Sequence, residues 1–239
     1  MSSGEAIGNF LSCYCTCILS EVYFSPRFFL LLSHNYSRRF GKGPHYIRFY
    51  VELGDQQSDG SATTESFVVK MADVSLMPMS NFAFLGQVKH GFWNDKKFDI
   101  NAGHILLASG ESVDANDEDE ANLGDLTDLG IASPIFGEYS QLRPHSELTL
   151  GFVANRPTPH FYINLQDNEV VHGLHSVQDH HFADGEADPS FADIIDGKDV
   201  VKRMVTQVPF FEAGGRRPNK TVKIVRAEID SDYTPSSLR

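Results

Sequence analysis

Short segments in which apolar and polar residues alternate recur along most of the chain, and they constrain the fold more than any other feature. The clearest is Val222–Ile229, which alternates strictly, and Tyr46–Leu53 is similar and rich in β-formers. Alternation with a period of two is typical of a strand with one buried face. We therefore expect strands at Tyr46–Leu53, Ser66–Met71, Phe98 with His104–Ala108 (a pair or one broken strand), Leu148–Val153, Phe161–Asn164 and Val222–Ile229.

Only two segments predict helices. Ser80 is of a helix-capping residue type, and the apolar residues after it keep a three-residue spacing up to Gly91. Lys198–Val205 suits a short amphipathic helix. Many short strands with two helices predict a mainly β fold, a closed antiparallel β-barrel capped by helices.

The chain divides into a globular part at residues 43–230, an N-terminal extension at 1–42 and a polar tail at 231–239. The extension carries apolar runs at Ala6–Ser20 and Phe28–Leu32. Residues 6–32 are open to two interpretations, a signal or membrane anchor and a poorly ordered extension. No Lys or Arg precedes Arg27, and no apolar run reaches the about 20 residues that a spanning helix needs. We expect the protein in the secretory pathway or at a membrane, and otherwise in the cytoplasm.

The charge of the chain excludes one class of partner. A net charge of −12 argues against nucleic acid, because phosphate binding needs a basic face. Eight of the eighteen residues of Glu111–Asp128 are acidic, so we expect a solvated loop there. An EF-hand is excluded, because Asp119 stands where the calcium loop requires glycine. The three cysteines lie at positions 13, 15 and 17, so the globular part has no disulfide framework.

Histidines gather in one polar segment, where His172, His175, His180 and His181 stand beside Asp179 and Asp184. Imidazole suits zinc, copper or nickel. The spacing matches no zinc signature, however, and cysteine partners are absent. Histidines of a solvated loop are the favoured interpretation, metal binding by the loop at 172–184 stays an alternative, and we expect no cofactor.

Six short segments carry motifs in a recognisable order. They are 77–85 (MPMSNFAFL), 91–98 (GFWNDKKF), 145–155 (HSELTLGFVAN), 160–163 (HFYI), 196–201 (DGKDVV) and 223–229 (KIVRAEI). Together they resemble the cyclophilin-type peptidyl-prolyl cis-trans isomerases, over roughly Pro44 to Ile229. The resemblance implies a cyclophilin-like β-barrel that binds proline-containing polypeptides.

The same resemblance implies a defect in catalysis. A catalyst of rotation about an X–Pro bond must weaken amide resonance, most simply by a hydrogen bond to the prolyl nitrogen. In cyclophilins an arginine two residues after a conserved Phe donates it, whereas Phe98 is followed here by Asp99 and Ile100. Loss of such a donor costs about 10²–10³ in rate. Leu107 stands at a glutamine position and the loop tryptophan has no counterpart, so we predict no catalytic residue.

Five positions are implied to bind the polypeptide: His104, Ala154, Asn155, His160 and Tyr162. The prediction is a binding domain whose isomerase activity is weak or lost. The first alternative is an active isomerase in which His104, His160 or Arg156 donates the hydrogen bond. The second is the metal-binding loop.

Overall fold

The structure is a computed structural model of the 239-residue chain. It describes residues 36, 38–54, 63–110, 124–131, 138–153, 158–173, 187–211 and 220–235. The apolar segment 6–32, Ala154, Asn155, Arg156 and His175–Asp184 lie outside the described residues, so those predictions stay predictions. None of the helices in the described part has the length and apolar character needed to cross a bilayer.

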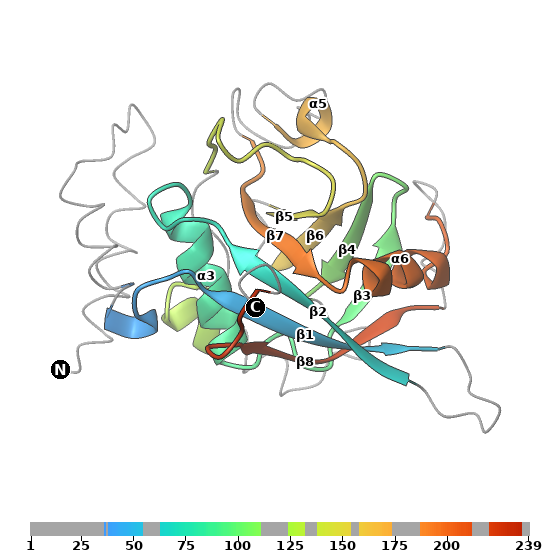
Figure 1. The fold of residues 1–239 in the computed structure, drawn as a ribbon, viewed down its shortest axis with the longest axis horizontal. Coiled ribbons are helices and arrows are strands. Elements are labelled where there is room, and N and C mark those ends of the chain that lie inside the picture. Colours follow the sequence, from blue (N-terminus) through green and yellow to red (C-terminus); the bar gives the residue numbers. More distant parts are fainter. Residues whose placement is uncertain are drawn as a thin grey trace.

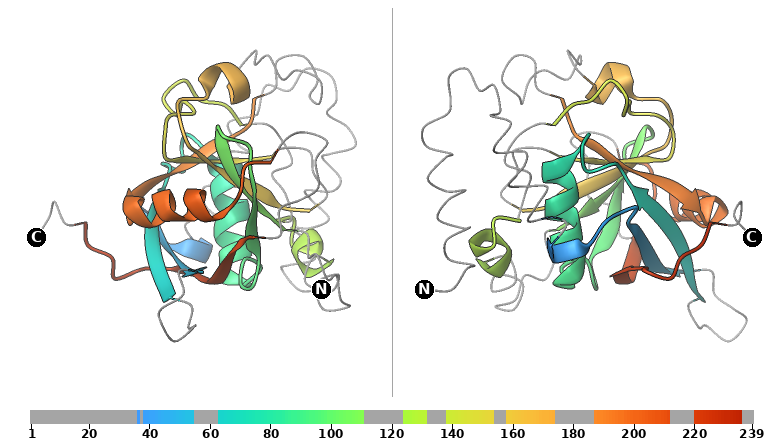
Figure 2. Two further views of the ribbon diagram at one scale, coloured as in Figure 1. Left: turned by 90° about the vertical axis from the view of Figure 1, so that its right-hand side faces the viewer. Right: turned by 60° about the vertical axis from the view of Figure 1, so that its left-hand side comes forward.

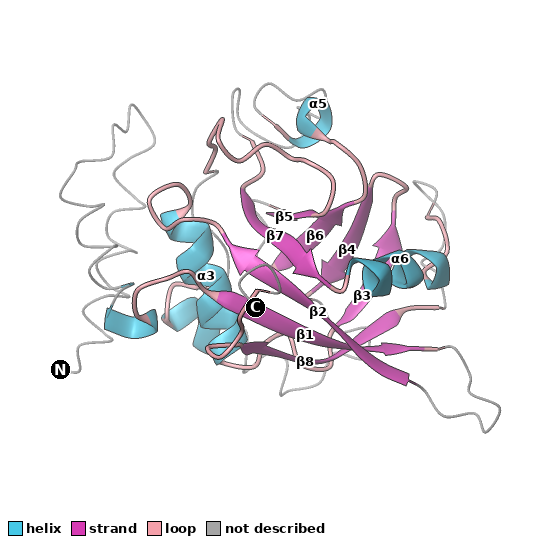
Figure 3. Cartoon of the chain, viewed as in Figure 1, coloured by secondary structure: helices cyan, strands magenta, loops and turns pink. Residues whose placement is uncertain are grey.

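Eight strands close into an antiparallel barrel in the order β1-β2-β7-β5-β6-β4-β3-β8 (Figures 1 and 3). Their bounds are β1 Tyr46–Leu53, β2 Thr63–Met71, β3 Lys97–Asn101, β4 Ile105–Ser109, β5 Thr149–Phe152, β6 His160–Asn164, β7 Ser190–Asp196 and β8 Val222–Ile229. The first strand closes against the last, with Phe49 opposite Ala227. The predicted closed antiparallel barrel is therefore confirmed, and β1 and β8 have the predicted bounds.

Aromatic side chains fill the barrel. The ring centroid of Phe161 on β6 lies 4.6 Å from that of Trp93, 5.5 Å from Phe98 and 5.8 Å from Phe49. Most of these pairs are tilted or edge-to-face, the arrangements that the ring quadrupoles favour. Phe161 is completely buried, and its position fixes which side of β6 faces inward.

Helix α3 (Pro78–Lys89) lies against one end of the barrel and inserts Phe84 among the interior rings (Figure 1). The Phe84 centroid is 5.3 Å from Phe161 and 4.7 Å from Phe191. All residues of the helix from Pro78 to Val88 are buried, so it has no solvent face. An amphipathic pattern is accordingly weak in its sequence.

The prediction that Ser80 caps this helix is wrong. The helix begins at Pro78, and Ser80 lies in its first turn. The cap comes from Glu138, whose carboxylate accepts hydrogen bonds from Met79 N at 2.6 Å, Ser80 N at 2.7 Å and Ser80 Oγ at 2.6 Å. A carboxylate at this position satisfies orphan N–H groups and complements the helix dipole. Burial nevertheless raises the pKa of Glu138, outweighing these three hydrogen bonds.

Two further helices lie outside the barrel wall (Figure 2). Helix α6 (Lys198–Gln207) confirms the predicted amphipathic segment and buries Val200, Val201 and Met204. Gly197 precedes it with φ of 72°, where a Cβ would come within 2.6 Å of a backbone oxygen, so the tight turn requires glycine. Helix α5 (Glu169–His172) has a single turn and was not predicted.

Three segments that were expected to lie outside the packed globular part contribute residues that pack against the barrel. The helical turn at 124–128 buries Leu126, which corrects the prediction of a solvated loop at that end of Glu111–Asp128. Tyr36, within the predicted N-terminal extension, belongs to the hydrophobic core. Tyr233, in the predicted polar tail, lies against Tyr46 with a centroid distance of 4.9 Å.

Replacement of Glu138 tests its hydrogen bonds to the N-terminus of α3. Glu138→Ala leaves three donors at the start of a buried helix without an acceptor, and we expect a loss of about 2 kcal/mol in the free energy of unfolding. Urea denaturation measures this loss. Glu147→Ala, at an exposed glutamate, is the control and should stay within about 0.5 kcal/mol of the parent. Equal effects of the two substitutions would contradict the role of Glu138 at the start of α3.

Candidate functional site

The candidate site lies on the outward side of β4, β6 and β5, which we call the outer face. In the strand register Leu107 lies opposite Tyr162, and Tyr162 lies opposite Gly151. Ser109 is paired with His160 in the neighbouring row. Because side chains alternate along a strand, the inward position of Phe161 directs His160 and Tyr162 outward.

The structure brings some of the predicted site residues together. His160 and Tyr162 share the outer face, and His104 stands in the turn that leads into β4. Ile100 lies opposite Leu107 on β3, and both aliphatic side chains are half-buried. Along β4, Ser109 is the cross-strand partner of His160, and Leu107 is the cross-strand partner of Tyr162.

A cap covers most of this face. We use the word cap for residues 138–148 together with α5, which lie beyond β5 and β6 in Figure 3. Tyr162 and Asn164 on β6 have no exposed surface. The ring of Tyr162 lies over Gly151, where an added Cβ would come within 2.4 Å of it. Glycine at position 151 therefore allows the tyrosine to reach across the sheet to the cap.

Asp188 is the centre of a buried polar cluster formed by His104, His145, Tyr162, His172 and Asp188. Its Oδ2 accepts hydrogen bonds from Tyr162 Oη at 3.1 Å and His172 Nδ1 at 3.0 Å. Its backbone oxygen accepts one from His145 Nε2 at 2.8 Å. A buried carboxylate is stable only with such donors, and here they come from the cap and from β6.

Asparagines and a second carboxylate extend this network. Asn168 Nδ2 donates to Asn164 Oδ1 and to the backbone oxygen of His104, at 2.8 Å in each case. Asn168 N donates to the backbone oxygen of His145 at 2.7 Å. Glu169 Oε2 accepts a bond from His145 N at 3.0 Å. The cap is thus fastened to the outer face by polar contacts.

Burial controls the ionisation of the cluster. It lowers the pKa of His145, a shift that His172 adds to and the backbone oxygen of Asp188 opposes. Burial also lowers the pKa of His104, again with a contribution from His172. The pKa of Tyr162 is raised well above its ordinary value by burial first and by Asp188 second. Tyr162, His104 and His145 are therefore neutral near pH 7.

The hydrogen bonds fix the donor roles of both predicted site histidines. A carbonyl oxygen only accepts, so His104 Nδ1 donates to Ala102 O at 3.2 Å and His160 Nδ1 donates to Thr158 O at 2.8 Å. His160 Nε2 is paired with Ser109 Oγ at 3.2 Å. The Nδ1–H of each histidine therefore already has an acceptor.

The rings of His104 and His172 are stacked, with centroids 5.4 Å apart and planes 18° apart. Neither Nε2 has a hydrogen-bond partner among the described groups. An imidazole lone pair lies in the plane of its ring, so two stacked rings do not point at a common ion between them. Within the described ranges no three His, Cys, Asp or Glu side chains are grouped as a metal site. His175, His180 and His181 lie outside those ranges.

Five participants in the network had no predicted role: His145, Asn164, Asn168, Glu169 and Asp188. Asn164 carried a usable signal, because it is a polar residue at an outward position of a strand that is otherwise apolar. The contacts to Asp188 had none, because they join residues 16, 26 and 43 positions apart along irregular segments.

Removal of one hydroxyl tests the bond between β6 and Asp188. We expect Tyr162→Phe to lower the free energy of unfolding by about 2 kcal/mol, because the buried carboxylate loses a donor. Tyr50→Phe, whose hydroxyl donates to the half-exposed Glu228, is the matched control and should cost at most about 1 kcal/mol. Chemical denaturation measures both, and a Tyr162→Phe protein as stable as the parent would refute the role of this bond.

No protein-family model matches the sequence, and no curated protein matches it either. Solved structures do match. The chain is similar to a cyclophilin-type peptidyl-prolyl cis-trans isomerase of Cryptosporidium parvum (16% identity, 79% of this chain and 99% of that chain, TM-score 0.49). The same protein in the presence of the dipeptide Ala-Pro gives 16% identity, 77% and 99% coverage and a TM-score of 0.46. Cyclophilin AquaCyp293 of Hirschia baltica gives 12% identity, 90% and 84% coverage and a TM-score of 0.43. These three structures represent two proteins, each of which is named a cyclophilin.

Proposed function

We propose that this barrel is a polypeptide-binding domain that accepts extended or proline-containing segments on its outer face, with isomerase activity that is weak or lost. The observation that carries the proposal is the lack of a free donor among the described side chains of this face. Ile100 and Leu107 are aliphatic, and the N–H groups of His104 and His160 are already engaged. Binding needs none of these donors, whereas rotation of the X–Pro bond does.

The shape of the outer face also supports binding without efficient isomerisation. Ile100 and Leu107 form a half-buried apolar pair across β3 and β4, and such a pair favours contact with a proline ring. Tyr162 is turned into the polar cluster and has no exposed surface. It therefore forms no open floor for a proline while the cap is in place.

A binding experiment tests the first half of the proposal. We expect a fluorescent peptide that contains Ala-Pro to bind the protein, and the same peptide with Ala in place of Pro to bind more weakly. Leu107→Glu should weaken binding at least about tenfold by placing a charge in the apolar pair. Leu142→Glu, at a cap residue that is 75% exposed, is the matched control. Fluorescence polarisation gives the affinities, and equal affinity of both variants would contradict the site.

A gain-of-function substitution tests the second half. We expect the parent protein to show little or no rate above background in a protease-coupled isomerase assay, and Ile100→Arg to raise it by up to about 10²–10³. Val225→Arg, on β8 away from the outer face, introduces the same charge and should change nothing. Substantial parent activity that His160→Ala or Arg156→Ala abolishes would favour the alternative, an isomerase with a non-standard donor.

A further inference from the structure

We propose that the polar cluster makes the cap acid-sensitive, so that protonation of His104 and His145 releases residues 138–148 and α5 from the outer face. This is a form of regulation of the face on which the proposed function depends. Its test needs no ligand, so its failure and the failure of that function are distinguishable.

Three imidazoles meet in the cluster. The ring of His172 lies 5.4 Å from that of His104 and 5.9 Å from that of His145, and it also lies 4.7 Å from Tyr162. They come from three different elements: the turn before β4, α5 and the cap segment 138–148. A charge gained by any of them is therefore felt across the contact between the cap and the sheet.

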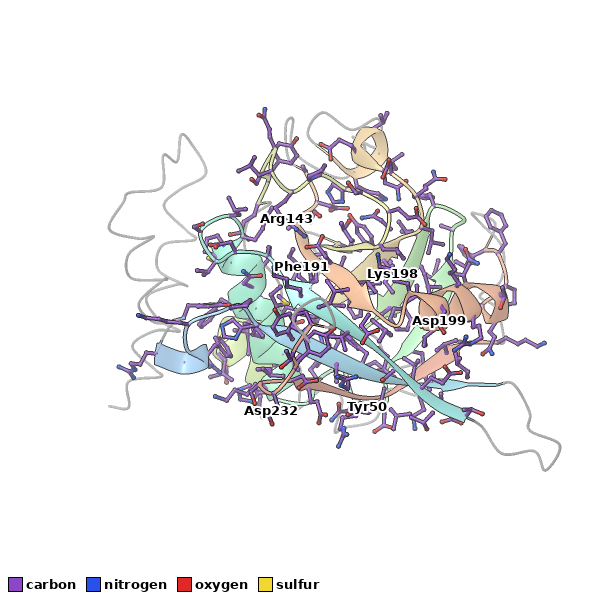
Figure 4. The ribbon with its side chains drawn as sticks, in the orientation of Figure 1. Tyr50, Arg143, Phe191, Lys198, Asp199 and Asp232 are labelled. Carbon is purple, nitrogen blue, oxygen red and sulfur yellow. The ribbon has the colours of Figure 1, made fainter. Side chains whose placement is uncertain are left out.

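The charged groups around these rings are unevenly matched. Asp188 faces His172 directly, and Glu169 on α5 accepts a hydrogen bond from the backbone of His145. The described cation of the cap, Arg143, is directed at Asp193 on β7 at 2.6 Å; Figure 4 shows it near Phe191, the strand residue two positions before that aspartate.

The remaining titratable neighbours do not offset a positive charge on His104 or His145. Tyr162 on β6 stays neutral because its pKa is raised. Tyr139 donates to Glu169 at 2.8 Å and so uses part of that carboxylate. His160 is directed at Ser109 and Thr158, one row away.

A proton on His104 or His145 is consequently poorly accommodated. Asp188 Oδ2 is already paired with His172 Nδ1 at 3.0 Å. The added charge enters a buried ring, and the new N–H on His104 has no acceptor among the described groups. A buried charge of this kind favours opening of the contact, which returns the ring to water.

The direction of the pH effect follows from linkage. Closure of the cap lowers the pKa of His104 and His145 from the ordinary value of 6.5. Between the lowered and the ordinary pKa, the open form binds protons that the closed form does not. The closed form is thus favoured above that range, and it loses population as the pH falls through it.

Hydrogen exchange tests the proposal on the full chain. We expect amides at 138–148 and 169–173 to lose protection at least about tenfold between about pH 7.5 and about pH 5, after correction for intrinsic exchange. Amides of β1 and β8, which pair with each other far from the cap, should keep theirs. Equal loss in all strands would mean global unfolding and would overturn the proposal.

Two variants assign the effect to the cluster. His104→Phe keeps a ring against His172 but accepts no proton. The loss of amide protection between the two pH values should therefore shrink to less than about threefold. His90→Gln, at an exposed histidine beside Arg39, should behave as the parent. If His104→Phe is poorly folded, histidine titration of the parent by NMR decides: His104 and His145 must titrate below the ordinary range in step with the cap amides. Unchanged acid sensitivity in a folded His104→Phe protein, or independent titration, would overturn the proposal.

Discussion

The packing of Phe161 against Phe84, Trp93 and Phe98 is the constraint on which the rest of the structure depends. It fills the barrel, and it docks α3 against one end through Phe84. Because side chains alternate along β6, it also fixes the outward direction of His160, Tyr162 and Asn164. The candidate site is therefore a geometrical consequence of the core, and no shift of register on β6 can alter one without the other.

The outer face combines two environments that serve different purposes. Around Ile100 and Leu107 it is apolar and half-exposed, which suits contact with a polypeptide. Around Asp188 it is polar and closed, and its hydrogen bonds hold the cap in place. The Nδ1–H groups of His104 and His160 are used in the structure itself, since each already has a backbone carbonyl acceptor. The proposed function rests on the first of these environments, and the proposed acid sensitivity rests on the second.

Alternation in the sequence was sufficient for most of the strands, because a period of two records which side of each strand is buried; β7, whose burial pattern does not alternate, was not predicted. It gave β1 and β8 their bounds, whereas His160 and Tyr162 were named as site residues only through the family resemblance. It failed where the partner of a residue is remote in sequence. The N-terminal N–H groups of α3 are bound by Glu138, 58 residues beyond Ser80, so the prediction that Ser80 caps the helix was wrong. The polar cluster was not predicted from the sequence, for the same reason. Asp188 and His145 lie in irregular segments, whose spatial meeting no local periodicity records.

Strand β6 has no solvent-facing side, since all five of its residues are buried: Phe161 and Ile163 face the aromatic interior, and His160, Tyr162 and Asn164 face outward, the last two beneath the cap. A strand of this kind tolerates few replacements on either face: polar residues fail inside, and apolar ones leave Asp188 or Asn168 without partners. A saturation mutagenesis map would consequently show a uniform band of intolerance along β6. Such a band would record packing and hydrogen bonding, so sensitivity to substitution there is no evidence of catalysis.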